Sequence, residues 1–195
     1  MAVPSLPLSG DKIAIRRKAR EQRRAFVAGI SEAQREKLEA SLAAHLAPLI
    51  ATSRIIGAYA PMPDEISPFP ALEQARQSAT TIAFPAFSDH LATLRFLAGE
   101  PSETGPFGVM QPPLDSVEVH PDLILVPLVA IDPAFNRLGQ GKGHYDRVLP
   151  ELRRRGALLI GIGWPVQRLK ETIEPEAWDV ALDGFASPNG LELKR

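Results

Sequence analysis

Residues 122–152 read DLILVPLVAIDPAFNRLGQGKGHYDRVLPEL, and this stretch decides the fold class. It begins with an unbroken apolar run from Leu123 to Val129, which is typical of a strand buried on both faces of a parallel sheet. A polar loop follows, with glycines at positions 139, 141 and 143, and from Tyr145 the apolar residues return at helical spacing. The stretch therefore predicts a strand, a glycine-rich loop and a helix, a layout that points backbone N–H groups at an anion.

Three cations surround the glycine loop, namely Arg137, Lys142 and Arg147. Glycines let the backbone approach a ligand closely, and together with these cations they favour a phosphate site. The spacing is not that of a P-loop, because Gly143 rather than serine or threonine follows Lys142, and it is not GxGxxG either. From spacing alone, a phosphate site and an ordinary strand-to-helix turn with glycines for packing explain the loop equally well.

The composition describes an ordinary globular protein. The chain has 195 residues, 45% hydrophobic and 23% charged, which fits one domain spanning 1–195 with 1–8 as a loose tail. A net charge of −1 gives no field that would recruit nucleic acid. The absence of cysteine excludes disulfides, thiolate zinc sites and cysteine nucleophiles. We expect a cytoplasmic protein without a membrane segment or secretory signal, because the apolar runs are too short.

A basic helix is predicted from Lys12 to Val27, with Ser9 and Asp11 available as caps. Residues 12–24 include seven basic residues and one acidic residue. Four of the basic residues share one face at spacings of three or four: Lys12, Arg16, Arg20 and Arg23. A solvated face, a nucleic-acid patch and a phosphate clamp folded onto the glycine loop are the three interpretations of this run.

The remaining chain alternates between predicted strands and helices. Strands are predicted in 54–60, 81–84, 92–97, 158–163 and 180–186, helices in 67–79 and from the Ser31 capping box to just before Pro48, and a Pro/Gly-rich loop in 103–113. This alternation predicts an α/β fold, a three-layer sandwich with a mostly parallel sheet. Asp64 and Glu65 follow the first of these strands, where they are either ligand contacts or turn and helix-cap residues.

The segment RLGQGKGHYDR at 137–147, preceded by a buried strand and the segment 130–132, resembles the signature of the 5-formyltetrahydrofolate cyclo-ligase (methenyltetrahydrofolate synthetase) family. In that family the signature runs R-L-G-x-G-x-G-x-Y-D-R. Lys12 and Arg16 match the family's N-terminal K-x-x-x-R, and residues 175–179 resemble its P-x-E-x-H-D. The resemblance implies a fold similar to ribose-phosphate isomerases and CoA transferases.

The resemblance also implies an enzyme that uses ATP and Mg²⁺ to convert 5-formyltetrahydrofolate to its 5,10-methenyl form. It places catalytic roles on Lys12, Tyr145 and Arg147, folate contacts on Arg16 and Glu65, and magnesium ligands on Asp146 and Asp179. It places ATP contacts on Lys12, Arg16, Arg137, Leu138, Gly139, Gln140, Gly141, Lys142, Gly143, His144 and Tyr145. For Arg147, contact with phosphate and pairing with a carboxylate that fixes the loop are equally open.

Several positions depart from the family pattern: Lys142, His144, Phe135 where glycine is frequent, and Trp178 in place of a histidine. They leave the core signature intact, so we expect activity. The alternative is a catalytically inactive paralogue that binds folate or nucleotide. We expect 5-formyltetrahydrofolate as the partner, no nucleic acid, no membrane, and a monomeric protein.

Overall fold

The Leu123–Pro127 strand, β6, lies in the middle of a seven-stranded sheet in the computed structural model, which describes residues 12–176 and 178–194. The strand order is β11-β10-β9-β6-β1-β2-β3. The other six strands of this sheet are β1 (Ile55–Gly57), β2 (Thr81–Ala86), β3 (Arg95–Ala98), β9 (Leu158–Ile162), β10 (Gly184–Ser187) and β11 (Gly190–Leu193). The sheet from β10 to β2 is parallel, and the two edge strands β3 and β11 are antiparallel. The predicted α/β fold with a mostly parallel sheet is confirmed.

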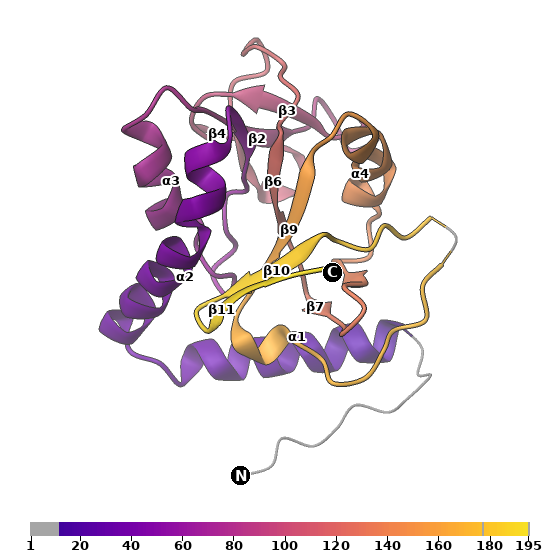
Figure 1. Ribbon diagram of the computed structural model, residues 1–195. Helices are drawn as coiled ribbons and strands as arrows, with labels where there is room; N and C mark the ends of the chain where they lie inside the picture. The colour runs from indigo at the N-terminus through magenta and orange to yellow at the C-terminus, as the bar shows by residue number, and fades with distance from the viewer. Residues whose placement is uncertain (1–11, 177, 195) are drawn as a thin grey trace.

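Helices cover both faces of this sheet, so the molecule has three layers (Figure 1). α2 (Glu32–Thr52) and α3 (Phe69–Arg76) pack on one face, and α4 (His144–Arg154) packs on the other. Alternate residues of β6 explain why its sequence is apolar throughout. Leu123 and Leu125 join the core beneath α2 and α3, whereas Ile124 and Val126 join the core beneath α4.

The basic helix α1 (Lys12–Ala28) lies across the carboxyl ends of the parallel strands, along the lower edge of Figure 1. Its apolar residues Ile15 and Ala19 are buried against Val129 and Leu138, which follow β6 along the chain. The other faces of α1 carry its arginines and lysines. Burial of this short apolar stripe therefore holds a strongly basic helix beside the glycine loop.

The direction of the chain through the sheet reverses between β1 and β6. From β1 the chain passes through α3 to β2 on one side, and from β6 it passes through α4 to β9 on the other. At such a reversal the loops leave the sheet in opposite directions and open a crevice beyond the carboxyl ends of the strands. The segments that enter this crevice are those that follow β1, β2 and β6.

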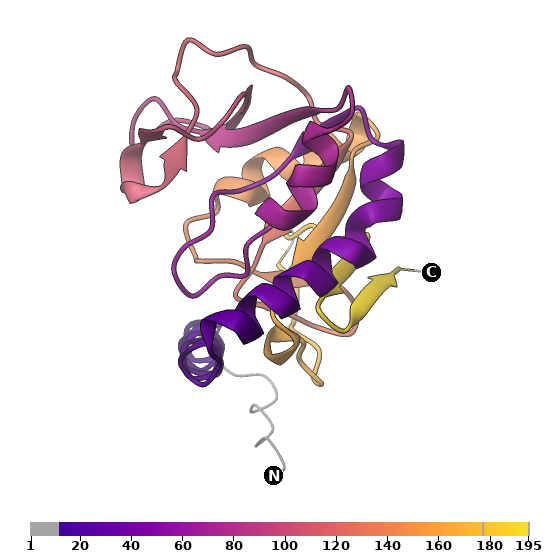
Figure 2. The ribbon, with the colours of Figure 1, turned by 90° about the vertical axis from the view of Figure 1, so that its left-hand side faces the viewer.

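Two small hairpins lie outside the main sheet. β7 (Ala130–Ile131) pairs with β8 (Arg137–Leu138), and β4 (Glu103–Thr104) pairs with β5 (Met110–Gln111) around the 3-10 turn η1 (Pro106–Gly108). Figure 2 shows the β4–β5 hairpin projecting away from the helical layers. A second 3-10 turn, η2 (Pro165–Gln167), follows β9. The Pro/Gly-rich loop predicted over 103–113 contains the β4–β5 hairpin, which the sequence did not reveal because two-residue strands carry too short a pattern to be detected.

The sequence also misplaced several boundaries. α2 continues through Pro48 to Thr52 instead of ending before the proline, because its buried stripe continues through Leu46 and Ile50 on both sides of Pro48. The helix predicted over 67–79 is limited to α3. The strand predicted over 180–186 begins at Gly184, and the antiparallel partner β11 was missed. The remaining predicted strands shift by a few residues at their ends.

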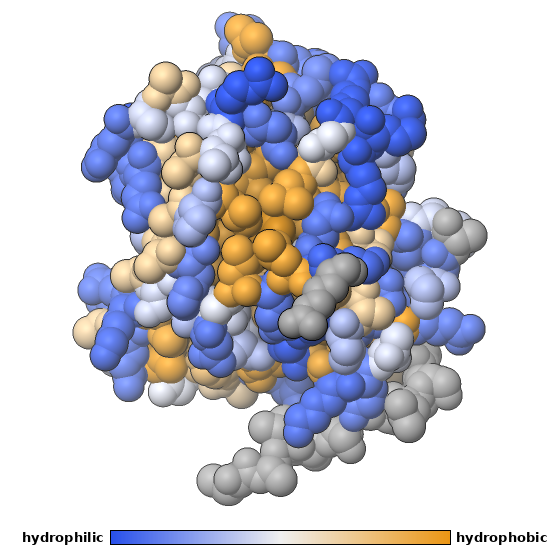
Figure 3. Space-filling view, in the orientation of Figure 1, coloured by the Kyte–Doolittle hydropathy of each residue, from blue (hydrophilic) through white to orange (hydrophobic). Residues whose placement is uncertain are grey.

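The surface of the face seen in Figure 3 is mostly hydrophilic, with an apolar area between α2 and α4 over the sheet. Among the described residues, no helix has the length and apolar character needed to span a bilayer. The predicted tail 1–8 and the predicted caps Ser9 and Asp11 lie outside the described residues.

Candidate functional site

A cavity of about 270 Å³ opens where the chain direction reverses between β1 and β6. Its volume is roughly ten or more times that needed by one water molecule. Its walls come from segments far apart in sequence: α1, the residues after β1, the ends of β2 and β6, the β4–β5 hairpin, and the glycine loop with the start of α4. The cavity therefore lies where an open α/β sheet binds its ligands.

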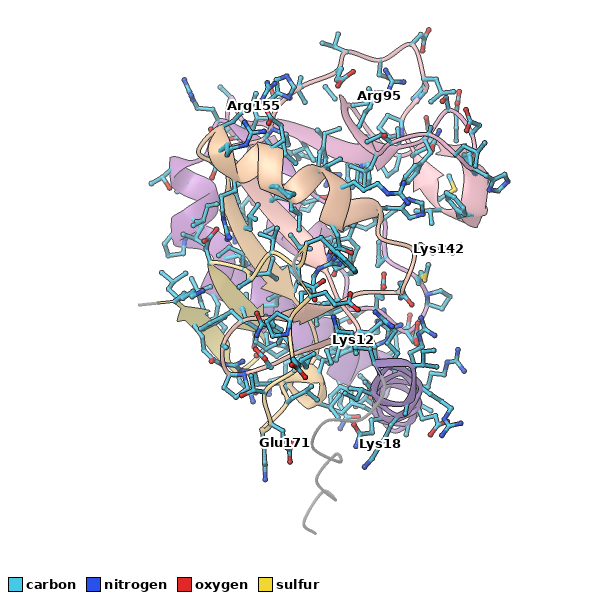
Figure 4. All side chains as sticks on the ribbon, turned by 90° about the vertical axis from the view of Figure 1, so that its right-hand side faces the viewer. Lys12, Lys18, Arg95, Lys142, Arg155 and Glu171 are labelled. Carbon is cyan, nitrogen blue, oxygen red and sulfur yellow. The ribbon has the colours of Figure 1, made fainter. Side chains whose placement is uncertain are left out.

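The basic helix and the glycine loop meet at one end of this cavity. Arg16 donates its Nε–H to the Gly139 carbonyl at 3.1 Å. Arg20 donates to the Gln140 side-chain oxygen at 3.1 Å and to the Gln140 carbonyl at 2.8 Å. Figure 4 shows Lys12 on α1 beneath the loop that carries Lys142. The structure thus brings together two segments that lie more than a hundred residues apart, as the phosphate-clamp interpretation of the basic run requires.

The glycines of the loop have conformational reasons to be there. Gly141 and Gly143 have φ values of 92° and 67°, a left-handed region that costs other residues energy. A Cβ on Gly139 would lie 2.7 Å from an Arg137 guanidinium nitrogen, too close for contact. Gly143 is also the N-cap of α4, and among the described residues no side chain caps the first amides of that helix. These amides and the positive end of the helix dipole lie at the cavity wall.

Three ion pairs occupy the same end. Lys12 pairs with Asp179 at 2.7 Å and with Glu176 at 3.2 Å, and Arg137 pairs with Asp146. Partial burial lowers the pKa of Lys12, but the Asp179 and Glu176 carboxylates outweigh it and the net pKa is raised. For Asp179, burial raises the pKa, yet the hydrogen bond from Lys12 and the charge of Arg137 leave it lowered overall. The Asp179 carboxylate is therefore ionised at neutral pH and held by Lys12.

The two aspartates were also the predicted magnesium ligands. In the described part of the chain, no cluster of three His, Cys, Asp or Glu side chains is close enough to form a metal site. The donor set does not fit a cage built by the protein alone. It fits a Mg²⁺ bound chiefly through phosphate oxygens, which needs one or two carboxylates besides water. Asp146 and Asp179 both line the cavity and could supply them.

Tyr145 and His144 begin α4 with their side chains against the cavity. Burial raises the pKa of the Tyr145 hydroxyl, and that hydroxyl has no hydrogen-bond partner among the described residues. Both His144 ring nitrogens are likewise covered and unpartnered there. Burial and then the charges of Arg147 and Lys142 lower the pKa of His144, so its ring is neutral at physiological pH. Neutral, unpartnered polar atoms at a cavity wall are suited to contact a ligand.

Leu138, Lys142 and Arg147 take different places. Leu138 is buried in β8 against α1 and also reaches the cavity. Lys142 lines the cavity and holds its ammonium 4.2 Å from the centre of the Phe107 ring. Arg147 is exposed, does not line the cavity, and donates to the Lys142 carbonyl at 3.2 Å. The geometry thus associates Arg147 with fixing the loop, and its catalytic role stays a prediction.

The other end of the cavity is apolar and aromatic. Phe107 lies on the β4–β5 hairpin. Its ring packs edge-on against Phe87 at 5.4 Å and at a tilt against His144 at 4.8 Å, both measured between ring centres. Gln111 ties the hairpin to the end of β2, because its side chain bonds to both the N–H and the carbonyl of Phe87. Phe96 of β3 is buried in the core beneath α4 and does not line the cavity.

Glu65 also lines the cavity and is almost fully buried. Its carboxylate accepts the Met62 N–H at 3.1 Å and a Gln140 amide N–H at 3.4 Å, and it faces Arg23 at 3.5 Å. Burial raises the pKa of Glu65, and the Met62 N–H and the Arg23 charge only partly oppose that rise. A carboxylate with this setting is a candidate for recognising N–H donors of a ligand.

The sequence assigned no individual site role to Arg20, Arg23, Phe87 or Phe107. It did group the two arginines with Lys12 and Arg16 on one face of the basic helix, but it left the phosphate clamp, the nucleic-acid patch and the solvated face as interpretations. The two phenylalanines carried no local signal, because their place depends on how a hairpin folds over the sheet.

Comparisons with known proteins agree with the geometry. Residues 8–188 match the model of the 5-formyltetrahydrofolate cyclo-ligase family. The chain is 30% identical over 177 residues to the 5-formyltetrahydrofolate cyclo-ligase of Haemophilus influenzae, covering 86% of this chain and 94% of that protein. It is 27% identical over 150 residues to the Escherichia coli enzyme of the same name, covering 73% and 82% respectively.

Two solved structures are similar as well. The 5,10-methenyltetrahydrofolate synthetase of Aquifex aeolicus superimposes with a TM-score of 0.78 at 26% identity, covering 94% of this chain and 93% of that one. The synthetase of Mycoplasma pneumoniae superimposes with a TM-score of 0.66 at 22% identity, covering 92% and 99%, and supports the fold.

Proposed function

The chain belongs to the 5-formyltetrahydrofolate cyclo-ligase family, and we propose that it uses ATP and Mg²⁺ to form 5,10-methenyltetrahydrofolate, ADP and phosphate. Family membership makes the chain a cyclo-ligase that acts on a folate. The nucleotide, the metal ion and the products are the proposed part. The observation that supports them is one cavity with two unlike ends, one rich in cations and free amides and the other aromatic.

The chemistry asks little covalent work of the protein. The formyl oxygen attacks the γ-phosphorus of ATP, the bond from that phosphorus to the bridging oxygen breaks, and ADP leaves. Nitrogen 10 then attacks the activated formyl carbon, the bond from that carbon to the phosphorylated oxygen breaks, and phosphate leaves while nitrogen 10 gives its proton to solvent. The protein must align the reacting atoms and neutralise charge that develops on the phosphoryl oxygens.

The residues at the cationic end suit that task. Lys12 and Arg16 on α1 and Arg137 on the loop would hold the phosphates, with the Gly143 end of α4 offering amides and Lys142 adding charge from beside the Phe107 ring. Bound Mg²⁺ would neutralise phosphate charge, and Asp146 and Asp179 would hold it. Phosphate oxygens would then replace these carboxylates as partners of Lys12 and Arg137, so the ion pairs seen in the structure would be exchanged on binding.

The pterin ring of the folate suits the other end. Its flat aromatic surface would lie against the apolar residues around Phe107, and its ring N–H groups would donate to the Glu65 carboxylate. Tyr145 lies where the two ends meet, with its hydroxyl unpartnered among the described residues. That hydroxyl would contact the formyl group or the phosphoryl group next to it.

A turnover assay tests this proposal. Purified protein with 5-formyltetrahydrofolate, ATP and Mg²⁺ should raise the absorbance of the methenyl product, and omitting ATP or adding excess EDTA should abolish the rise. Binding of both ligands without product would instead identify a catalytically inactive paralogue. Turnover without ATP would contradict the proposed role of the nucleotide.

A further inference from the structure

Arg23 is a buried cation next to the cavity that the proposed reaction does not use. Its side chain is 3% exposed, and it comes from the middle of α1. It donates to the Asp64 carboxylate at 3.1 Å and to the Leu128 carbonyl at 3.3 Å, and it faces Glu65 at 3.5 Å. The cavity is lined by Glu65 but not by Arg23, which therefore lies behind the carboxylate.

A cation in this place needs an explanation. Removing a guanidinium from water is costly, and a buried ion pair is frequently no more stabilising than apolar residues of similar size. Arg23 nevertheless meets two acidic side chains that are neighbours in sequence, Asp64 and Glu65. Asp64 and the Leu128 carbonyl fix the guanidinium, while Glu65 turns towards the cavity. The arrangement resembles a support for one functional carboxylate.

We propose that Arg23 is a positioning residue for substrate recognition, which keeps Glu65 ionised and correctly oriented to accept hydrogen bonds from the N–H donors of the pterin ring. The inference rests on the proposed function in so far as the ligand of this end is a folate. It assigns to the basic helix a second task, distinct from holding phosphates.

The electrostatics around Glu65 support this role. Burial raises the pKa of Glu65, and the neighbouring Asp64 raises it further, whereas the Met62 N–H, Arg23 and Gln140 lower it. The Tyr59 and Tyr145 hydroxyls near Glu65 have raised pKa values and stay neutral. From α2, Arg35 bonds to the Glu65 backbone carbonyl and pairs with Glu39. Among the described residues, Arg23 is the only cationic side chain within ion-pair distance of the Glu65 carboxylate.

The test compares Arg23→Met with Arg24→Met as a matched control on the same helix. Arg24 lies next in sequence and reaches Asp64 only at 3.8 Å, with 72% of its side chain exposed. For Arg23→Met we expect the KM for 5-formyltetrahydrofolate to rise about tenfold or more at neutral pH, because the Glu65 carboxylate is then more readily protonated. The acid limb of 1/KM against pH should move to higher pH, while kcat and the KM for ATP change by less than about threefold. Arg24→Met should behave as wild type, and Arg23→Lys should recover part of the loss.

A second variant keeps the inference testable if Arg23→Met does not fold. Asp64→Asn removes the acidic neighbour that raises the pKa of Glu65, so the acid limb should move to lower pH, opposite to Arg23→Met. Folded Arg23→Met with an unchanged acid limb and unchanged KM would overturn the inference, as would Asp64→Asn with a limb moved to higher pH. If wild-type protein fails to bind 5-formyltetrahydrofolate in a direct titration, the proposed function itself fails. If wild type, Arg23→Met and Arg24→Met all bind 5-formyltetrahydrofolate with the same pH dependence, only the proposed role of Arg23 is overturned.

Discussion

The two ends of the cavity hold their charges in different ways. At the cationic end, the Asp179 and Asp146 side chains keep 18% and 27% of their surface exposed. At the other end, Glu65 keeps 9% and its partner Arg23 keeps 3%. Water reaches the first pairs, so a charged ligand can replace a partner at small cost. Separating Arg23 from Glu65 would instead leave the Glu65 carboxylate buried without a cation, although Arg23 would keep Asp64 as a partner. The exposed ion pairs of Asp179 and Asp146 are suited to exchanging a partner for phosphate, and the buried pair of Arg23 and Glu65 is suited to recognising a ligand of fixed shape.

The largest effect should come from Lys12→Ala at the cationic end. Loss of a cation that stabilises charge on the transferred phosphoryl group lowers kcat/KM by about a hundredfold to a thousandfold. Arg17→Ala is the control, because Arg17 lies on the same helix, is exposed and does not line the cavity. Steady-state rates at saturating folate measure the effect. If Lys12→Ala keeps an activity within about threefold of wild type, the ion pair between Lys12 and Asp179 has no catalytic importance.

Asp146→Asn should have the next largest effect, and it concerns the metal. If the Asp146 carboxylate moves from Arg137 to Mg²⁺ when ATP binds, the Mg²⁺ concentration for half-maximal rate should rise about tenfold to a hundredfold. Glu151→Gln on the same helix is the control, because that carboxylate pairs with Arg154 and Arg155. A Mg²⁺ titration of the rate gives the midpoint. An unchanged midpoint in Asp146→Asn means that the metal assignment is wrong.

Phe107 tests the aromatic end with a smaller effect. Its φ of 71° is left-handed, a strained conformation for a residue other than glycine. Both Phe107→Ala and Phe107→Gly remove the ring that packs on Phe87 and His144, so the KM for folate should rise about threefold to tenfold. Only glycine relieves the backbone strain. The free energy of unfolding of Phe107→Gly should therefore exceed that of Phe107→Ala by about 1 kcal/mol. Equal stability of the two variants in urea would show that the turn is not strained.

The sequence predicts the cationic end of the cavity better than the aromatic end. The parallel sheet and the glycine loop were predictable, because the apolar run of 123–129 and the glycines at 139, 141 and 143 are local signals. The approach of Lys12 and Arg16 to that loop followed from the resemblance to a known family. These signals cover the cationic end almost completely.

The aromatic end depends on contacts between distant residues. Arg23 stands in a basic run whose ordinary interpretation is a solvated face, and its burial requires Asp64, 41 positions later in the chain. Phe107 reaches the cavity only because Gln111 bonds to the backbone of Phe87, 24 positions earlier. Gly105 is needed there as well, since a Cβ would lie 2.0 Å from the Gln111 side-chain oxygen. No pattern of period 2 or 3.6 reports such tertiary contacts.

The smallest expected effects are on stability, and they have opposite signs at the two ends. The lowered pKa of Asp179 means that its ionised form stabilises the fold above the unfolded-state pKa, and that this contribution is lost as pH falls through the folded-state pKa. Asp179→Asn should therefore lower the free energy of unfolding at neutral pH by at most about 1 kcal/mol, and the difference from wild type should vanish once the pH falls below the lowered folded-state pKa of Asp179.

Glu65→Gln should behave in the reverse way, because the pKa of Glu65 is raised in the folded state. The folded protein then binds a proton more readily than the unfolded chain, so ionised Glu65 costs stability above its folded-state pKa, and the cost disappears as pH falls through that pKa. Glu65→Gln should be as stable as wild type or slightly more stable at neutral pH, by at most about 1 kcal/mol, while its folate binding weakens. Urea unfolding at neutral and acid pH measures both variants. A loss of stability in Glu65→Gln as large as in Asp179→Asn would mean that the buried carboxylate serves the fold rather than the ligand.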